Sequence, residues 1–179
     1  EVYGLELELK KNLLRFNADD DEFDHKISGG LNISLLQTVQ DLDTQKVTDE
    51  TDYSANFTFD SSKLTGASDL LLNADISYIK EFDEFKSIQG TITYNYFSDQ
   101  LNTIGTLNKG NVIDKSYGTL DFIVKGKIKE FSFGLSAKNI LNPVIFRVQE
   151  VYNTPGVQEV VLDEFIRGVN LSLSVGYKF

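Results

Sequence analysis

The stretch Gly168-Val-Asn-Leu-Ser-Leu-Ser-Val-Gly-Tyr-Lys-Phe179 alternates strictly between apolar and polar residues. One side of an extended backbone would carry Val169, Leu171, Leu173, Val175, Tyr177 and Phe179, and the other Asn170, Ser172, Ser174, Gly176 and Lys178. This period of two predicts a β-strand with one apolar face. Eleven residues extend about 36 Å, and a tilt near 45° brings the span to about 25 Å, the height of the apolar band of an outer-membrane barrel.

Six earlier segments show the same alternation, and we predict that they are antiparallel strands. They cover residues 3–13, 25–39, 70–78, 88–96, 120–128 and 131–141, and Pro143 is expected to end the last of these. The connections alternate between short ones (17–24, 81–85 and 129–130) and long ones (about 40–68, 98–116 and 144–167). No segment shows helical periodicity, and the first long connection (about 40–68) has no clean periodicity of either kind.

Composition narrows the class of protein. The 179 residues favour one domain, and the formal charge of −10 argues against a nucleic-acid partner. Without cysteine, neither a disulfide framework nor a thiolate metal site can form. No apolar run reaches 18 residues, so no transmembrane helix is encoded. Because the chain contains no methionine and starts at Glu1, we expect a mature chain or a fragment.

A membrane barrel and a soluble β-sandwich both produce alternating strands. Three features favour the barrel: short and long connections alternate, aromatic residues gather near strand ends, and the polar face is small and hydrophilic enough for a wet lumen. The aromatic residues in question are Tyr3, Tyr78, Phe82, Phe85, Tyr94, Tyr96, Tyr117, Phe131, Phe133, Tyr177 and Phe179. The alternative is a soluble sandwich or small closed barrel that acts as a binding or structural module.

Charged residues on the polar strand faces are expected to face the lumen, because a charge near the bilayer midplane costs about 2–4 kcal/mol. These candidates are Glu6, Glu8, Lys10, Asp75, Asp121, Lys125 and Lys127. Most lumen residues are expected to form hydrogen bonds with water and with one another. Only those that contact a passing ligand affect which ligand is transported. Ligand contact is also plausible for the aromatic residues of the long connections, which are Tyr53, Phe57, Phe59, Phe146 and Tyr152.

Catalytic and metal chemistry find little support in the sequence. His25 is the only histidine and is expected to be a solvated turn residue, so we predict no enzyme and no cofactor. The acidic turn offers a weak Ca²⁺ candidate in Asp19, Asp21 and Asp24, but it lacks the glycine and final glutamate of an EF-hand loop. The acids of the first long connection (Asp41, Asp43, Asp49, Glu50 and Asp52) are likewise interpreted as solvated.

Several motifs resemble the late barrel strands of TonB-dependent outer-membrane receptors, with the character of the Bacteroidota members. They are Gly4-Leu-Glu-Leu-Glu-Leu-Lys-Lys-Asn12, Gly66-Ala-Ser-Asp-Leu-Leu-Leu-Asn-Ala-Asp-Ile-Ser-Tyr78, Leu120-Asp-Phe-Ile-Val124 and Leu135-Ser-Ala-Lys-Asn-Ile-Leu-Asn-Pro143, together with the terminal Phe179. Each motif is short, but their order and spacing extend over nearly the whole chain.

The resemblance implies an all-β, antiparallel up-and-down transmembrane barrel of about 22 strands, of which residues 1–179 would form the last seven. The chain departs from the family pattern because it contains neither the plug domain nor the earlier strands. Tyr177 and Phe179 would then lie at the periplasmic end, where the barrel-assembly machinery recognises the terminus. The resemblance further implies location in the bacterial outer membrane, contact with its lipid, energy from TonB–ExbB–ExbD through the missing plug, and a surface lipoprotein partner. The imported ligand stays open among siderophore, vitamin, peptide and glycan.

Overall fold

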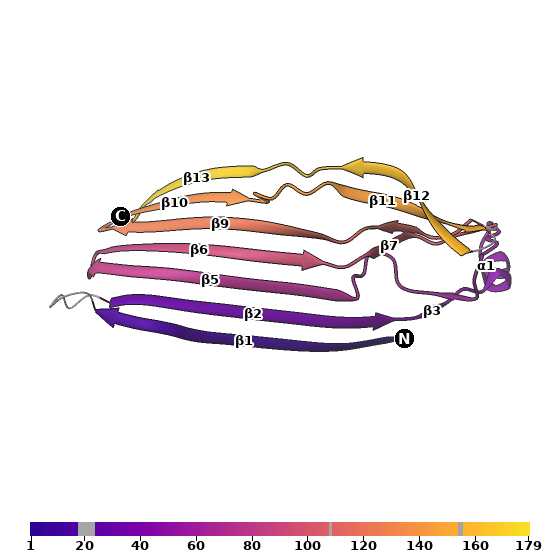
Figure 1. The fold of residues 1–179 in the computed structure, drawn as a ribbon, viewed down its shortest axis with the longest axis horizontal. Helices are drawn as coiled ribbons and strands as arrows, with labels where there is room; N and C mark the ends of the chain where they lie inside the picture. Colours follow the sequence, from indigo (N-terminus) through magenta and orange to yellow (C-terminus); the bar gives the residue numbers. More distant parts are fainter. Residues whose placement is uncertain (18–23, 108, 154–155) are drawn as a thin grey trace.

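The computed structural model describes residues 1–17, 24–107, 109–153 and 156–179. Seven long antiparallel strands form what we call the main sheet, and they neighbour one another in chain order (Figure 1). They are β1 (Val2–Asn17), β2 (Asp24–Thr38), β5 (Leu70–Asp83), β6 (Lys86–Phe97), β9 (Tyr117–Ile128), β10 (Phe131–Lys138) and β13 (Asn170–Tyr177). All seven predicted strands and their antiparallel order are therefore confirmed. The sheet is an open meander whose two outer strands are β1 and β13.

The two ends of the main sheet differ, as the alternation of short and long connections predicts. Figure 1 shows the long connections gathered at the right-hand end, with α1 and β7, while the C-terminus lies at the left-hand end. At that left end β5 joins β6 through a turn at Glu84–Phe85, and β9 joins β10 through Lys129–Glu130. Lys129 adopts a positive φ of 52° in this two-residue turn, as tight hairpin turns require.

Cross-strand register brings the apolar residues of all seven strands to one face. Ile76, Ile92 and Phe122 stand opposite one another on three adjacent strands, and Leu135 stands opposite Leu173. No described segment of the chain covers these side chains: Ile76 is 48 % exposed and Leu173 is 76 % exposed. The predicted apolar faces are thus real and continuous, and they lie bare on one side of a single layer.

A β-bulge interrupts the simple alternation that the sequence predicts over residues 3–13 of β1. Pairing with β2 shifts between Asn12 and Leu14, so that Leu13 is an extra residue and Leu14 comes opposite Ile27. The bulge keeps Leu14 on the apolar face although a strict period of two from Leu9 would send it to the polar one. A second shift lies between Glu81 and Asp83, beside the turn into β6.

The long connections contain regular structure that the sequence alone does not predict. What we call the loop sheet has the order β12-β11-β8-β7. Its strands are β7 (Gln100–Thr103), β8 (Val112–Asp114), β11 (Ile145–Asn153) and β12 (Gly156–Phe165), and a separate pair joins β3 (Gln40–Asp41) to β4 (Ser61–Ser62). Strands of two to four residues are too short to show a period. In the β11–β12 hairpin, a register shift between Arg147 and Val148 interrupts the alternation.

Two local features also differ from the sequence prediction. A short helix, α1 (Thr44–Glu50), starts after Asp43, whose carboxylate accepts hydrogen bonds from the backbone N–H of Gln45 and Lys46. Its seven residues include none that are buried, so it leaves no apolar periodicity to detect. Strand β10 ends at Lys138 rather than at residue 141, because Asn139 and Asn142 take positive φ angles of 56° and 42° and turn the chain before Pro143.

The tightly buried apolar residues of the described chain lie in or beside the loop sheet, not on the main sheet's apolar face. Ile145 and Val148 of β11 are 2 % and 4 % exposed, and Leu101 and Tyr117 are similarly buried. The accessible surface is 12519 Å², whereas a compact folded monomer of 20.1 kDa would expose about 8,700 Å². The surface is large because the apolar face of the main sheet and its two outer strands are exposed. No helix among the described residues is long and apolar enough to cross a membrane.

Candidate functional site

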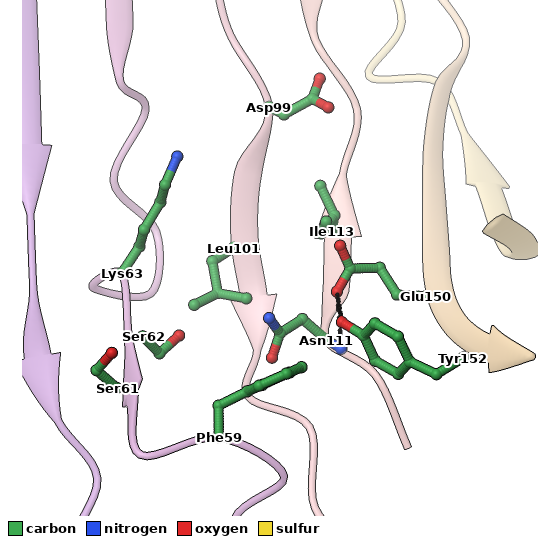
Figure 2. Close-up of a pocket in the computed structure, with 10 residues that line it drawn as sticks. All are labelled: Phe59, Ser61, Ser62, Lys63, Asp99, Leu101, Asn111, Ile113, Glu150 and Tyr152. Atoms are coloured by element: carbon green, nitrogen blue, oxygen red, sulfur yellow. Dashed lines mark hydrogen bonds between the residues drawn. The ribbon is translucent and has the colours of Figure 1, made fainter. Parts of the chain in front are cut away.

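A cavity of about 400 Å³ lies among the three long connections (Figure 2). It is bounded by the segment around β4, by β7 and β8, and by β11, which are distant in sequence. The residues that line it are Phe59, Ser61, Ser62, Lys63, Asp99, Leu101, Asn111, Ile113, Glu150 and Tyr152. An aromatic, hydroxyl, amide and carboxylate lining of this size is suited to a small organic ligand.

Cross-strand pairs connect this cavity with the polar side of the main sheet. Phe97 stands opposite Tyr117 on that side, with their rings stacked 5.0 Å apart. Two residues further out along both segments, Asp99 and Lys115 form an ion pair of 2.6 Å. Another two residues out, Leu101 of β7 pairs with Ile113 of β8. Because Asp99 and Leu101 line the cavity, it lies directly beyond the ends of β6 and β9, where Phe97 and Tyr117 stack.

Two aromatic rings and one carboxylate meet at one end of the cavity. The rings of Phe59 and Tyr152 are edge to face, with centroids 5.5 Å apart. The Tyr152 hydroxyl donates a hydrogen bond of 2.8 Å to Oε2 of Glu150 (Figure 2). Burial, then this hydrogen bond and the charge of Glu150, raise the pKa of Tyr152 to about 12. The phenol is therefore neutral and acts as a donor at physiological pH.

The backbone holds Glu150 in place from the segment before β8. The N–H of Asn111 donates to Oε2 of Glu150 over 3.3 Å, and the N–H of Glu150 donates to the carbonyl of Asn111 over 2.9 Å. Gly110 donates its N–H to the Glu150 carbonyl over 3.1 Å, and a Cβ at residue 110 would collide with the Glu150 backbone. This close approach requires glycine and fixes where the carboxylate enters the cavity.

Two lysines, Lys63 in the cavity lining and Lys115 beside the lining residue Asp99, are already paired with carboxylates. Lys115 lies 2.6 Å from Asp99 and 3.1 Å from Glu159 of β12, and Lys63 pairs with Asp69. Burial alone would raise the pKa of Asp99, but hydrogen bonds from Lys115 and from the Ser116 backbone outweigh it and the net pKa is lowered. The same Asp99 hydrogen bond raises the pKa of Lys115.

An ion pair on the neighbouring strands stiffens the loop sheet. Arg147 donates from Nε and Nη2 to the two carboxylate oxygens of Asp114 over 2.6 and 2.9 Å, which joins β11 to β8. The hydrogen bonds from Arg147 lower the pKa of Asp114 against the opposing effect of burial. Such a two-pronged contact fixes orientation as well as distance.

The structure places all seven charged candidates from the sequence on the polar face of the main sheet. Lys10, Asp75 and Asp121 belong to one transverse row, in which they alternate with Gly30 and Thr93. Lys10 also forms a 2.5 Å ion pair with Glu8, while Glu6 accepts a 2.8 Å hydrogen bond from Asn32. Lys125 and Lys127 lie opposite Gln89 and Ser87, nearer the end with short turns. None of the seven lines the cavity.

The predicted terminal residues belong to an aromatic cluster at that same end. Tyr177 lies 4.9 Å from Phe131 and 5.1 Å from Phe179, measured between ring centroids. His25 is not a free turn residue: its ring stacks on Phe16 at 4.8 Å, and its Nδ1 lies 2.7 Å from the Tyr78 hydroxyl. These contacts hold the histidine within the sheet rather than in a solvated turn.

The acidic candidates have different outcomes. Asp19 and Asp21 lie outside the described residues, as does the Asp24 side chain. Asp43 caps α1 and Asp49 accepts a hydrogen bond from Gln45, so both have structural roles. Among the residues that the structure describes, no group of three or more histidine or acidic side chains could hold a metal ion.

Of the loop aromatics singled out from the sequence, Phe59 and Tyr152 line the cavity, whereas Tyr53, Phe57 and Phe146 do not. Sequence reasoning missed Asp99, Asn111 and Glu150, because these residues are far apart in sequence and come together only through the loop sheet. Comparison with protein-family models, with curated proteins and with solved structures finds no match for this chain.

Proposed function

We propose that the chain forms seven adjacent strands in the wall of a larger outer-membrane barrel that imports a scarce ligand, in the manner of a TonB-dependent receptor. In this proposal the apolar face meets outer-membrane lipid and the polar face lines the lumen. The end with short turns faces the periplasm, and the loop sheet with its cavity faces outside. The TonB–ExbB–ExbD system would supply energy, the barrel-assembly machinery would insert the strands, and a surface lipoprotein would be an external partner.

The observation that carries the proposal is the bare apolar face of a single-layered sheet. Leu171, Leu173 and Val175 are 73 %, 76 % and 63 % exposed, and the register extends this surface across all seven strands. A soluble monomer rarely exposes apolar patches beyond a few hundred Å². Strand β6 has twelve residues, which extend about 40 Å and cross about 28 Å when tilted by 45°, enough for the hydrocarbon layer.

The alternative of a soluble sandwich needs a second sheet over that apolar face. The loop sheet does not provide one, because its buried residues lie beyond the strand ends and the main sheet's apolar side chains stay exposed. Three lysines occupy apolar-face positions (Lys11, Lys80 and Lys86), and long lysine stems can carry the ammonium toward headgroups. Lys80 and Lys86 also lie 4.7 and 5.8 Å from the Phe82 ring centroid, near the short turns.

The open edges favour a larger assembly over a seven-stranded unit. Among the described residues, strands β1 and β13 each have one neighbour, so their outer backbone groups lack a partner strand there. Hydrocarbon does not tolerate unpaired backbone groups, which is why membrane sheets close into barrels. Additional strands would pair with both edges and close the wall around the polar face.

A pair of substitutions in the middle of β6 tests the proposal. Ile92 points to the apolar face between Ile76 and Phe122, whereas Thr93 points to the polar face between Asp75 and Asp121. Arginine at a lipid-facing midplane position costs about 2–4 kcal/mol, so Ile92→Arg should sharply reduce the protein recovered folded in the outer membrane. Thr93→Arg is the matched control, and its two carboxylate neighbours should allow normal assembly. Equal assembly of both variants would contradict the proposal.

A further inference from the structure

The carboxylates around the cavity outnumber the cations. Among the residues that line it, Asp99 and Glu150 are acidic and Lys63 is basic, while Lys115, Asp69 and Glu159 are ion-pair partners outside the lining. Both lysines are committed to ion pairs with Asp69, Asp99 and Glu159. An anionic ligand would have to compete with these acids for the lysines, so the cavity disfavours phosphates and carboxylates.

Glu150 differs from the other acids because its described partners are neutral. Its Oε2 accepts hydrogen bonds from the Tyr152 hydroxyl and the Asn111 backbone, and no ion pair reaches it within the described part of the chain. Neutral donors orient a carboxylate without cancelling its charge. In Figure 2, Lys63 lies on the opposite side of the cavity from Glu150.

The aromatic rings beside Glu150 also favour a cationic ligand. Phe59 and Tyr152 border the cavity and are about 40 % exposed, so their surfaces are available to a ligand. Aromatic ring faces attract cations, and a carboxylate next to an aromatic ring is a common way to hold an organic ammonium group. Leu101 and Ile113 provide an apolar wall for the remainder of such a molecule.

We infer that the cavity binds an organic cation, with its ammonium group at the Glu150 carboxylate and its apolar part against Phe59, Tyr152, Leu101 and Ile113. The inference rests on the proposed receptor function, since it names the chemical class of the ligand to be imported. Glu150 supplies the charge, Tyr152 and the Asn111 backbone keep its carboxylate in position, and the paired lysines leave this charge uncompensated.

Three probes with one ring and different charges test the inference directly: phenethylamine (cationic), 2-phenylethanol (neutral) and phenylacetate (anionic). Affinities would be measured by calorimetry with the complete barrel of the proposal, which contains this chain, folded in detergent micelles. We expect phenethylamine to bind about fivefold to tenfold more tightly than 2-phenylethanol, and phenylacetate to bind most weakly. Raising NaCl from about 20 mM to about 500 mM should weaken the binding of the amine alone, because salt screens a partly exposed charge.

Glu150→Gln keeps the shape of the side chain and removes its charge, so the preference for the amine should disappear while 2-phenylethanol binds as before. Retained binding of the alcohol also reports that the variant cavity is folded. The matched control is Glu164→Gln on β12, which removes one charge from a residue that does not line the cavity. Equal affinities for the amine and the alcohol in the native chain, an amine preference that survives Glu150→Gln, or no binding of any probe would overturn the inference.

These outcomes can be distinguished from failure of the receptor proposal. The probe series is measured on folded protein and does not depend on membrane insertion in cells. Normal assembly of Ile92→Arg together with selective amine binding would reject the receptor proposal and support the cation site. Blocked assembly of Ile92→Arg together with no preference for the amine would support the receptor proposal and reject the cation site.

Discussion

Tyr152 and Glu150 lie two residues apart on β11, and the Tyr152 hydroxyl donates a 2.8 Å hydrogen bond to the Glu150 carboxylate. On an extended strand, residues two apart share a side, so both side chains enter the same cavity. The pair therefore places a neutral phenol and an anionic carboxylate next to each other, with Phe59 against the phenol ring at 5.5 Å.

This relationship predicts the alkaline titration of Tyr152. The Glu150 charge opposes ionisation of the phenol, and burial raises its pKa as well, to about 12. Glu150→Gln should move the pKa downward toward the ordinary value of 10.0, but not the whole way, because burial remains. Phenolate absorbance, with Tyr152→Phe to identify the relevant component among eight tyrosines, measures the change. An unchanged titration would mean that the hydrogen bond does not form.

The Arg147–Asp114 contact predicts how acid affects the loop sheet. Asp114 has a lowered pKa in the folded chain, so its contribution is fully present above the ordinary carboxyl pKa of 3.8 and is lost as the pH falls through the folded value. Hydrogen exchange of the β8 and β11 amides, expressed relative to the intrinsic rate at each pH, should therefore accelerate below about pH 4. Asp114→Asn should give that acceleration already at neutral pH, with a local loss of about 1–2 kcal/mol.

The control for this prediction is Lys46→Ala in α1. It removes a 4.0 Å ion pair with Glu50 in which both side chains are about 65 % exposed. Exposed pairs of this kind contribute less than about 0.5 kcal/mol. The β8 and β11 amides should exchange in this variant as in the native chain. If Asp114→Asn behaves like the control, the ion pair does not stabilise the loop sheet.

Two glycines in the main sheet should respond differently to the same substitution. A Cβ at Gly30 would collide with the carboxylate of Asp75, whereas a Cβ at Gly90 would meet nothing within 4 Å. Gly30→Ala should therefore lower the free energy of unfolding by about 1 kcal/mol or more, since the short Asp75 side chain must move. Gly90→Ala should be neutral or slightly stabilising, because alanine restricts the unfolded chain. Urea-induced unfolding followed by electrophoretic mobility compares the two variants, and equal effects would contradict the register of β2 with β5.

The main sheet could be predicted from the sequence because its strands are long and amphipathic. A segment such as Leu70–Asp83 shows its period of two directly, and adjacent strands pair in chain order, so no distant contact had to be guessed. The bulge at Leu13 escaped prediction because an extra residue is defined only by the partner strand. The sequence alone therefore does not assign Leu14 to a face, and only its pairing with Ile27 places it on the apolar face.

The cavity could not be predicted, for a different physical reason. Its walls come from the segment around β4 and from β7, β8 and β11, and the pairing of β8 with β11 joins segments more than thirty residues apart, as in the contact of Asp114 with Arg147. Strands as short as Val112–Asp114 carry no detectable period. The sequence identifies Phe59 and Tyr152 as candidates because they are aromatic residues in long connections. It does not predict that Glu150 contacts both Tyr152 and the Asn111 backbone.

Lipid contact along β6 tests the central claim most directly. The chain has no cysteine, so a single cysteine introduced at any one of positions 88–95 is the only thiol in the chain that a fluorophore can label. In vesicles of brominated phospholipid, we expect strong quenching at Ile88, Gly90, Ile92 and Tyr94, and weak quenching at Gln89, Thr91, Thr93 and Asn95. Quenching that does not alternate, or its absence at Ile92, would show that the apolar face of the main sheet does not meet lipid.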